Sequence, residues 1–273
     1  MTKRADFHIH TCCSDGLDTP QEVVQIALAK GLACIAITDH DSIEGVGPAV
    51  EAASGLPLEV LSGVELSTEW SSSDIHILGY MIDLHDEEFN RSLQRFCEAR
   101  LQRAKDIVEK LQKGGYSDIT FEEVRSLSKT DAIGRPHIAQ VLIQKGYTAD
   151  INDVFTRFLG EGCPYDIPKF KQTPYEAIEL IRRAGGAAVM AHPMKTLKDE
   201  LIPSFVEAGL VGLEAYYLGN SISETRFYER LARKYNLVAT GGSDAHGKAR
   251  GYSLIGEVAV DYSVVEALRQ RCG

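Results

Sequence analysis

The sequence lacks the features of a membrane or secreted protein. No stretch approaches the roughly 18 unbroken apolar residues of a membrane span, and the N-terminus has no apolar signal-peptide core. The six cysteines show neither the paired spacing of a zinc site nor the density of a disulfide scaffold. We therefore expect a cytoplasmic protein without membrane contacts whose cysteines stay reduced, with Cys12 and Cys13 filling space rather than acting as nucleophiles.

An excess of positive charge is also missing. The formal net charge is −10 and the isoelectric point is about 5.3. This argues against a general surface for polyanions, because nucleic-acid affinity depends mainly on Lys and Arg. The charge is uneven, however: residues 91–171 hold 14 basic and 11 acidic side chains, so this segment carries +3 and the remainder −13. We expect a bound anion to meet this middle segment.

What the sequence does contain is an alternation of short apolar runs with capped helical patterns, which is typical of βα units. Strands are predicted around residues 6–10, 33–38, 58–66, 75–82, 187–193, 210–217 and 237–246, and helices at 20–31, 173–186, 203–209, 223–236 and 263–271. Within 87–162 only helical patterns occur, at 89–113, 120–129, 135–146 and 153–160. We expect an α/β barrel formed by residues 1–90 and 163–273, with residues 91–162 as an all-helical insertion.

Histidines and carboxylates gather at the ends of the predicted strands. The residues concerned are His8, His10, Asp15, His40, Glu65, His76, His192, Asp244 and His246. In a parallel barrel the C-terminal strand ends share one face, so these side chains should converge. Each alone has a plainer explanation: a histidine there is usually a core or rim residue, Asp15 fits a turn, and Asp39 and Asp41 fit helix caps. Six of the eight histidines at one end outweigh those explanations.

The residue types point to a divalent transition metal. Imidazole nitrogens and carboxylate oxygens together suit Zn²⁺, Mn²⁺ and Fe²⁺. Because a strand has a two-residue period, His8 and His10 face one side, and so do Asp244 and His246. The candidates are too many for one tetrahedral site. We therefore expect a multinuclear cluster in which Glu65 bridges two ions.

The order of these motifs is that of a known family. HxH with a trailing Asp, TDH, an isolated Glu and His, xHP and SDAH together resemble the PHP (polymerase and histidinol phosphatase) family of metal-dependent phosphoesterases. The match covers nearly the whole chain, and every expected ligand position is filled. The resemblance implies a distorted (βα)₇ TIM-like barrel that holds three divalent ions, with manganese expected first and zinc or iron as alternatives.

The resemblance also implies a role for each ligand. His8, His10, Glu65 and Asp244 would hold the first ion, Glu65, His76 and His192 the second, and Asp15, His40 and His246 the third. A phosphate monoester dianion repels hydroxide, so its hydrolysis needs charge neutralisation and a strong nucleophile. We expect a hydroxide bridging the two ions shared by Glu65 to attack phosphorus. Catalytic roles accordingly fall to Glu65, His192, Asp244 and His246.

The predicted insertion offers cationic side chains for a second phosphate. Arg100 and Arg103 share one side of a long predicted helix, and Arg135 and His137 begin another. Arginine binds phosphate with a bidentate fork. We favour Arg103, Arg135 and His137 as substrate contacts, because the resembling enzymes carry similar residues here. For Arg100 a solvated helix face is an equal alternative. Weaker candidates are Lys169 and Lys171.

The helical insertion makes the chain similar to small bacterial PHP enzymes that act on nucleotides. We expect a phosphomonoesterase that removes the 3′-phosphate of nucleoside 3′,5′-bisphosphates, for example converting adenosine 3′,5′-bisphosphate to AMP and phosphate. The main alternative is a 5′-to-3′ exonuclease on short RNA or single-stranded DNA. An amidohydrolase, a histidinol phosphatase and a non-catalytic module stapled by metal are less favoured. No obligate protein partner is inferred.

Overall fold

The computed structural model describes residues 3–127, 133–168, 172–247 and 253–272. Lys169 and Lys171 therefore lie outside the described residues. The strands are β1 (Arg4–Ile9), β2 (Cys34–Ile37), β3 (Glu59–Trp70), β4 (Ser73–Tyr80), β5 (Ala187–Met190), β6 (Gly212–Tyr217), β7 (Val238–Gly242) and β8 (Val260–Asp261). They form one sheet in the order β7-β6-β5-β4-β3-β2-β1-β8.

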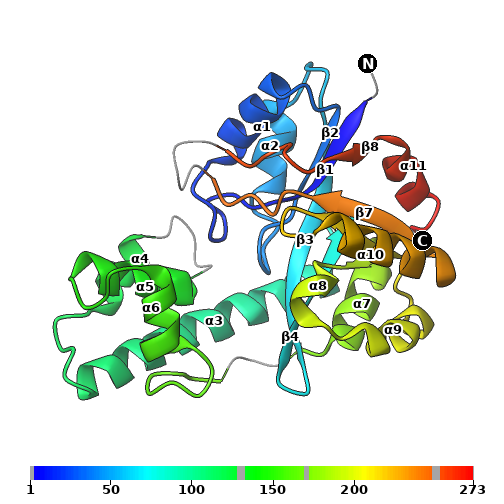
Figure 1. Cartoon of the computed structure of the whole chain (residues 1–273). Helices are drawn as coiled ribbons and strands as arrows, with labels where there is room; N and C mark the ends of the chain where they lie inside the picture. Colours follow the sequence, from blue (N-terminus) through cyan, green and yellow to red (C-terminus); the bar gives the residue numbers. More distant parts are fainter. Residues whose placement is uncertain (1–2, 128–132, 169–171, 248–252, 273) are drawn as a thin grey trace.

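The sheet curls until its first and seventh strands meet. Ile9 forms a parallel bridge with Ala245, and the backbone N–H of His10 donates to the carbonyl of Ala245 at 2.9 Å. Gly242 lies so close to β1 that a Cβ atom there would come within 2.3 Å of the Cβ of His8. The result is a nearly closed barrel, which confirms the predicted α/β barrel class (Figure 1).

One strand departs from the parallel arrangement that the sequence alternation predicts. β4 runs antiparallel to both β3 and β5. It follows β3 through a turn of two residues, Ser71 and Ser72, whose φ angles are +47° and +63°. Two residues with positive φ suit a tight hairpin and are far too few for a parallel crossover. His76, near the start of β4, consequently pairs with Ser67 and lies at the end of the barrel where the parallel strands finish.

Helices cover the outside of the sheet. Around the barrel lie α1 (Pro20–Ala29), α2 (Val46–Ala52), α7 (Pro174–Arg183), α8 (Pro193–Thr196), α9 (Ile202–Ala208), α10 (Ile222–Lys234) and α11 (Ser263–Arg269), with a 3₁₀ turn, η2 (Asp199–Leu201). Capping boxes at Thr19, Thr173 and Ser221 open α1, α7 and α10, because each side chain accepts the N–H of a glutamate three residues later and that glutamate returns the contact. Inside the barrel, Phe7 and Tyr80 pack edge to face at 5.5 Å between ring centroids.

The middle of the chain forms a helical lobe with its own core. α3 (Glu87–Lys113) leads from the barrel to α4 (Phe121–Ser126), α5 (Arg135–Gln144), α6 (Ile151–Val154) and a π-helical turn, η1 (Phe155–Leu159), as Figure 1 shows. Their apolar faces share one buried cluster that includes Ile107, Leu111, Ile138 and Phe158. A single helix was expected over 153–160; the structure divides this stretch between α6 and η1. Among the described helices none is long and apolar enough to cross a membrane.

Candidate metal centre

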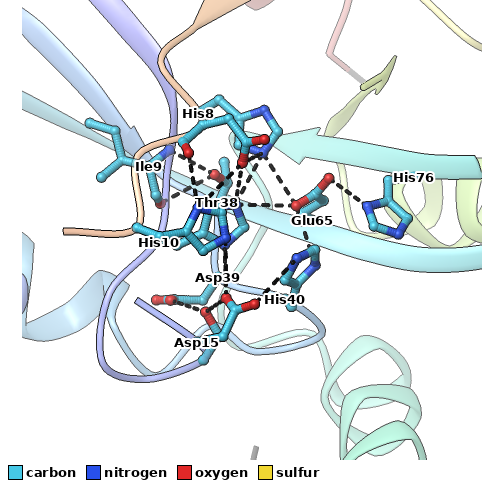
Figure 2. Close-up of polar contacts among 12 residues, drawn as sticks. His8, Ile9, His10, Asp15, Thr38, Asp39, His40, Glu65 and His76 are labelled. Carbon is cyan, nitrogen blue, oxygen red and sulfur yellow. Dashed lines mark hydrogen bonds and ion pairs between the residues drawn. The ribbon is translucent and has the colours of Figure 1, made fainter. Parts of the chain in front are cut away.

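A buried aspartate organises the loop that follows β1. Asp39 accepts the backbone N–H of Thr11 at 2.7 Å, the hydroxyl of Thr11 at 2.7 Å and the hydroxyl of Ser14 at 2.6 Å. These contacts hold the loop so that Asp15 turns back toward His10 and His40 (Figure 2). Asp39 is therefore an anchor of this loop rather than the helix cap that the sequence allowed.

Four side chains from three parts of the barrel converge on one point. The Nε2 atoms of His8 and His10 lie 3.1 Å apart, and each lies 3.2 Å from Oε2 of Glu65. Oδ1 of Asp244 lies 3.4 Å from Nε2 of His8 and 3.2 Å from Nε2 of His10. The ligand atoms of all four residues fall within 4.8 Å of one another, so this group could hold a metal ion.

The two carboxylate oxygens of Glu65 face different partners. Oε2 faces His8, His10 and Nδ1 of His40, the last at 3.2 Å. Oε1 lies 2.8 Å from Nδ1 of His76 and 3.0 Å from Nε2 of His192. His40, Glu65 and His76 form a second group whose ligand atoms lie within 4.8 Å of one another. His192 falls outside that group, although it touches Glu65.

A third group lies on the loop side of the cluster. Asp15 lies 3.7 Å from His10, 4.0 Å from His40 and 3.4 Å from His246, and these four residues again have ligand atoms within 4.8 Å of one another. The family resemblance assigned His10 to the first ion alone. In the structure its Nε2 faces the first group while its Nδ1 faces Asp15, so His10 lies between the two.

The electrostatics of the cluster fit bound cations. Burial opposes the charge of Glu65, yet the surrounding histidines hold the pKa of its carboxyl well below the ordinary value. Burial likewise opposes the charges of Asp15 and Asp244, but the neighbouring histidines outweigh it and lower the pKa of both carboxyls. Three ionised carboxylates, one buried and two partly buried, beside imidazole nitrogens only 3.1 Å apart call for positive charge between them. The donor set therefore suits divalent ions.

Backbone conformation helps to aim two of these ligands. His192 has φ +25° and Asp244 has φ +50°, both in a region that L residues with a side chain rarely adopt. Each stands two residues after the end of a strand, β5 or β7. Such conformations concentrate at functional sites because the surrounding structure must hold them in place.

A second buried glutamate, which the sequence reasoning missed, supports the histidines. Glu214 on β6 accepts a hydrogen bond from Nδ1 of His8 at 2.9 Å and from the backbone N–H of His192 at 2.7 Å. The proton on Nδ1 leaves the lone pair of His8 on Nε2, the atom that faces the first group. The only signal in the sequence was one acidic residue inside an otherwise apolar strand.

Asp244 is also supported from behind. Its Oδ2 accepts hydrogen bonds from Nζ of Lys195 at 3.0 Å and from the hydroxyl of Tyr217 at 3.0 Å. The Lys195 ammonium lies 4.6 Å from the centroid of the Tyr217 ring. Oδ2 is thereby occupied, and Oδ1 remains directed at His8 and His10. Neither Lys195 nor Tyr217 was predicted as a site residue.

The arginines of the helical lobe face the same cleft as the metal-ligand candidates. Asp15, His40 and His76 line it from the barrel, and Arg100, Arg103 and Arg135 line it from the lobe. Two of these guanidinium groups are fixed by main-chain carbonyls: Nε of Arg103 donates to Ile167 at 2.5 Å, and Arg135 donates to Leu159 at 3.1 Å. Burial and the charges of Arg135 and Arg100 lower the pKa of Arg103 to about 10.

The other two predicted substrate contacts, Arg100 and His137, also have partners within the protein. Arg100 forms an ion pair with Asp41 at 2.6 Å. Arg100 is therefore not a residue of a solvated helix face, which was the alternative considered from the sequence. Asp41 contacts Arg100 and is not a helix cap. Asp41 in turn accepts the N–H of Ser67 at 2.8 Å. His137 is buried and accepts the N–H of Gly134 through Nδ1 at 3.1 Å, which caps α5. Among the described residues, those that line the cleft do not include His137.

Comparison with known proteins identifies the family. The model of the PHP domain matches residues 6–159. The 5′-3′ exoribonuclease Rnm of Escherichia coli K12 is 36% identical, over 88% of this chain and 84% of the relative. The 3′,5′-nucleoside bisphosphate phosphatase of Chromobacterium violaceum is 32% identical, over 92% of this chain and 90% of the relative.

A solved structure agrees. A candidate metal-dependent phosphoesterase from Bifidobacterium adolescentis superposes with a TM-score of 0.88 at 33% identity, covering 98% of this chain and 96% of the other. The barrel, the histidine motifs and these relatives confirm the family that the sequence motifs predicted. The chain belongs to the PHP domain family and is a metal-dependent phosphoesterase.

Proposed function

We propose that the protein is a phosphomonoesterase that hydrolyses the 3′-phosphate of nucleoside 3′,5′-bisphosphates, with adenosine 3′,5′-bisphosphate as the model substrate. The observation that carries the proposal is the single cleft lined by Asp15, His40 and His76 on one side and by arginines on the other. A substrate with two phosphates can place the scissile one at the metal centre and the other on the arginines.

In this proposal three divalent ions, manganese first with zinc or iron as alternatives, are held as the family resemblance implies. The ligands would be His8, His10, Asp15, His40, Glu65, His76, His192, Asp244 and His246. When bound, such ions neutralise phosphate charge and lower the pKa of a bound water toward about 7. Residues 1–90 and 163–273 would carry the metals, and residues 91–162 would form the substrate-binding cap.

The protein's own side chains prepare that chemistry. Glu65 would be a ligand of two ions, because its two oxygens contact different histidines. Glu214 fixes the tautomer of His8, and Lys195 with Tyr217 keeps one oxygen of Asp244 occupied. The arginines orient the substrate by its second phosphate, so the scissile phosphate enters the cluster in one direction.

The second candidate is a 5′-to-3′ exonuclease on short RNA or single-stranded DNA. What favours it is the identity of 36% to a relative named as a 5′-3′ exoribonuclease. The arginines of the cleft could bind a phosphate of a nucleotide chain as well as one of a mononucleotide, while the negative net charge of the protein favours the small substrate.

Side-by-side assays separate the two candidates. Phosphate release from adenosine 3′,5′-bisphosphate is compared with shortening of a 5′-phosphorylated oligonucleotide, at equal enzyme and metal concentrations. We expect faster turnover of the bisphosphate. Little or no phosphate release from it, together with efficient shortening of the oligonucleotide, would contradict the first candidate and support the second.

Removing one arginine tests the second phosphate site. Arg103→Ala should raise the KM for the bisphosphate about 10-fold or more, because a charge-assisted contact is worth about 2 kcal/mol. Arg91 lies on the same helix α3 but is exposed and donates to the carbonyl of Glu87. Arg91→Ala is therefore the matched control, and equal KM values for the two variants would argue against the assignment.

A further inference from the structure

The cleft has a third kind of surface that neither metal ions nor phosphates need. Besides the metal-ligand candidates and the arginines, its lining includes apolar side chains of the helical lobe: Phe96, Ala104, Ile107, Ile133, Pro136 and Phe155. Metal ligands and guanidinium groups attract anions, so this apolar lining faces a part of the ligand that is uncharged and apolar.

The backbone around Phe155, one of the aromatic residues of this lining, has an unusual conformation. Phe155 opens the π-helical turn η1, and its carbonyl accepts the N–H of Gly160 at 2.9 Å. A Cβ atom at position 160 would come within 2.1 Å of that carbonyl oxygen, so only glycine fits there. Single π-turns inside helical segments are rare and occur frequently at functional sites.

The apolar residues of this turn all contact the core of the lobe but differ in exposure. Phe158 and Leu159 are buried in the core of the lobe, whereas Phe155 stays partly exposed and lines the cleft. The guanidinium of Arg135 lies 5.4 Å from the centroid of the Phe155 ring. One aromatic ring and one phosphate-binding side chain are thus held next to each other.

We propose that this apolar lining, which includes Phe155, is the nucleobase subsite of the cleft. The inference rests on the proposed function and adds to it a site for the base, which the ribose carries on C1′, apart from both phosphates. Phe155 would pack against the base while Arg135 beside it binds the phosphate. Because every base has an apolar face, stacking of this kind admits all four bases and rejects sugar phosphates that lack one.

Comparing a substrate with and without a base tests the proposal. Phe155→Ala is assayed on adenosine 3′,5′-bisphosphate and on ribose 3,5-bisphosphate, which keeps both phosphates and lacks the base. We expect kcat/KM for the nucleotide to fall about 10-fold or more, mainly through KM, because stacking on one aromatic side chain contributes that much. For the ribose compound we expect no change beyond about twofold. Phe155→Tyr, which keeps the ring, should restore the value for the nucleotide.

Phe121 provides the matched control. Its ring also lies under a cation, Lys105 at 5.4 Å, and it packs on the same core, but it does not line the cleft. Phe121→Ala should leave the ratio between the two substrates unchanged. An equal loss on both substrates with Phe155→Ala, or no loss on either, would overturn the base subsite.

The two proposals fail in distinguishable ways. If the wild-type protein releases no phosphate from the bisphosphate, the proposed function fails, and the base subsite is then tested by calorimetric binding of AMP and ribose 5-phosphate. Weaker binding of AMP by Phe155→Ala, with unchanged binding of ribose 5-phosphate, supports the subsite. Equal affinity of the wild type for the two ligands overturns it.

Discussion

Substitution of Glu214 tests whether the buried residues that support the histidines contribute to stability and to metal binding. Two donors, Nδ1–H of His8 and the backbone N–H of His192, converge on the Glu214 carboxylate at 2.9 and 2.7 Å. Glu214→Gln keeps the shape of the side chain but supplies only one acceptor oxygen, so one of the two donors must face an amide NH₂. Leaving a buried donor without an acceptor costs about 1–3 kcal/mol of unfolding free energy.

The same substitution should weaken metal binding. Loss of a carboxylate that orients a ligating histidine typically lowers metal affinity about 10- to 100-fold. We expect the variant to lose metal at lower chelator concentration than the wild type, as measured by metal analysis after dialysis, and to unfold at lower denaturant concentration. Glu207, exposed on the neighbouring helix α9, provides the control Glu207→Gln. Metal retention by Glu214→Gln equal to that of the control would refute the reasoning.

Three further substitutions or reactions have clear expected outcomes. His192→Ala should abolish phosphatase activity, because Nε2 of His192 lies 3.0 Å from Oε1 of Glu65 in the cluster. Circular dichroism should show that the barrel stays folded. Unchanged turnover would contradict the proposed role of His192 as a metal ligand. Asp39→Ala should lower the free energy of unfolding by about 2–3 kcal/mol, because Thr11 and Ser14 lose a buried acceptor. Urea titration measures this change, and a loss below about 0.5 kcal/mol would contradict the anchoring role. Burial raises the pKa of the Cys13 thiol to about 11, so only about one thiol in 1,000 is ionised at pH 8. Alkylation of Cys13 by iodoacetamide should therefore be slow and should become about tenfold faster with each pH unit. Rapid alkylation at pH 7 would show that the thiol is not protected.

Much of the barrel could be predicted from local pattern. The capping boxes at Thr19 and Thr173 and the apolar runs after them are local signals, and the helices begin where those signals stand. The direction of β4 was missed because the signal is only a pair of serines, a residue type that rarely adopts positive φ. The π-turn at Phe155 was missed for a similar reason, since α- and π-helical turns share the same apolar spacing over so short a stretch.

The candidate ligands were predictable because they cluster at strand ends, whereas their supports were not. Glu214 is 206 positions from His8 in the sequence, and Lys195 is 49 positions from Asp244. What these residues do depends on a partner brought close by the fold, and no local pattern encodes such a partner. His137 shows the same dependence on the fold: its place at the start of a helix and the family resemblance predicted a phosphate contact, and in the structure its Nδ1 accepts the N–H of Gly134 at the start of α5.

The closure of the barrel between Ile9 and Ala245 has a consequence for how the protein is made. The first group of metal-ligand candidates needs His8 near one end of the sequence and Asp244 near the other, and the backbone bond from His10 to Ala245 joins the same two regions. Contacts of such long sequence separation form late and slowly, because the entropy of closing the loop must be overcome first. The lobe of α3 to η1, by contrast, has a buried core of its own whose contacts lie within one continuous segment. The groups that include Asp244 and His246 therefore form only after the C-terminal part of the barrel has been made, whereas the residues of the second group, His40, Glu65 and His76, are all made early.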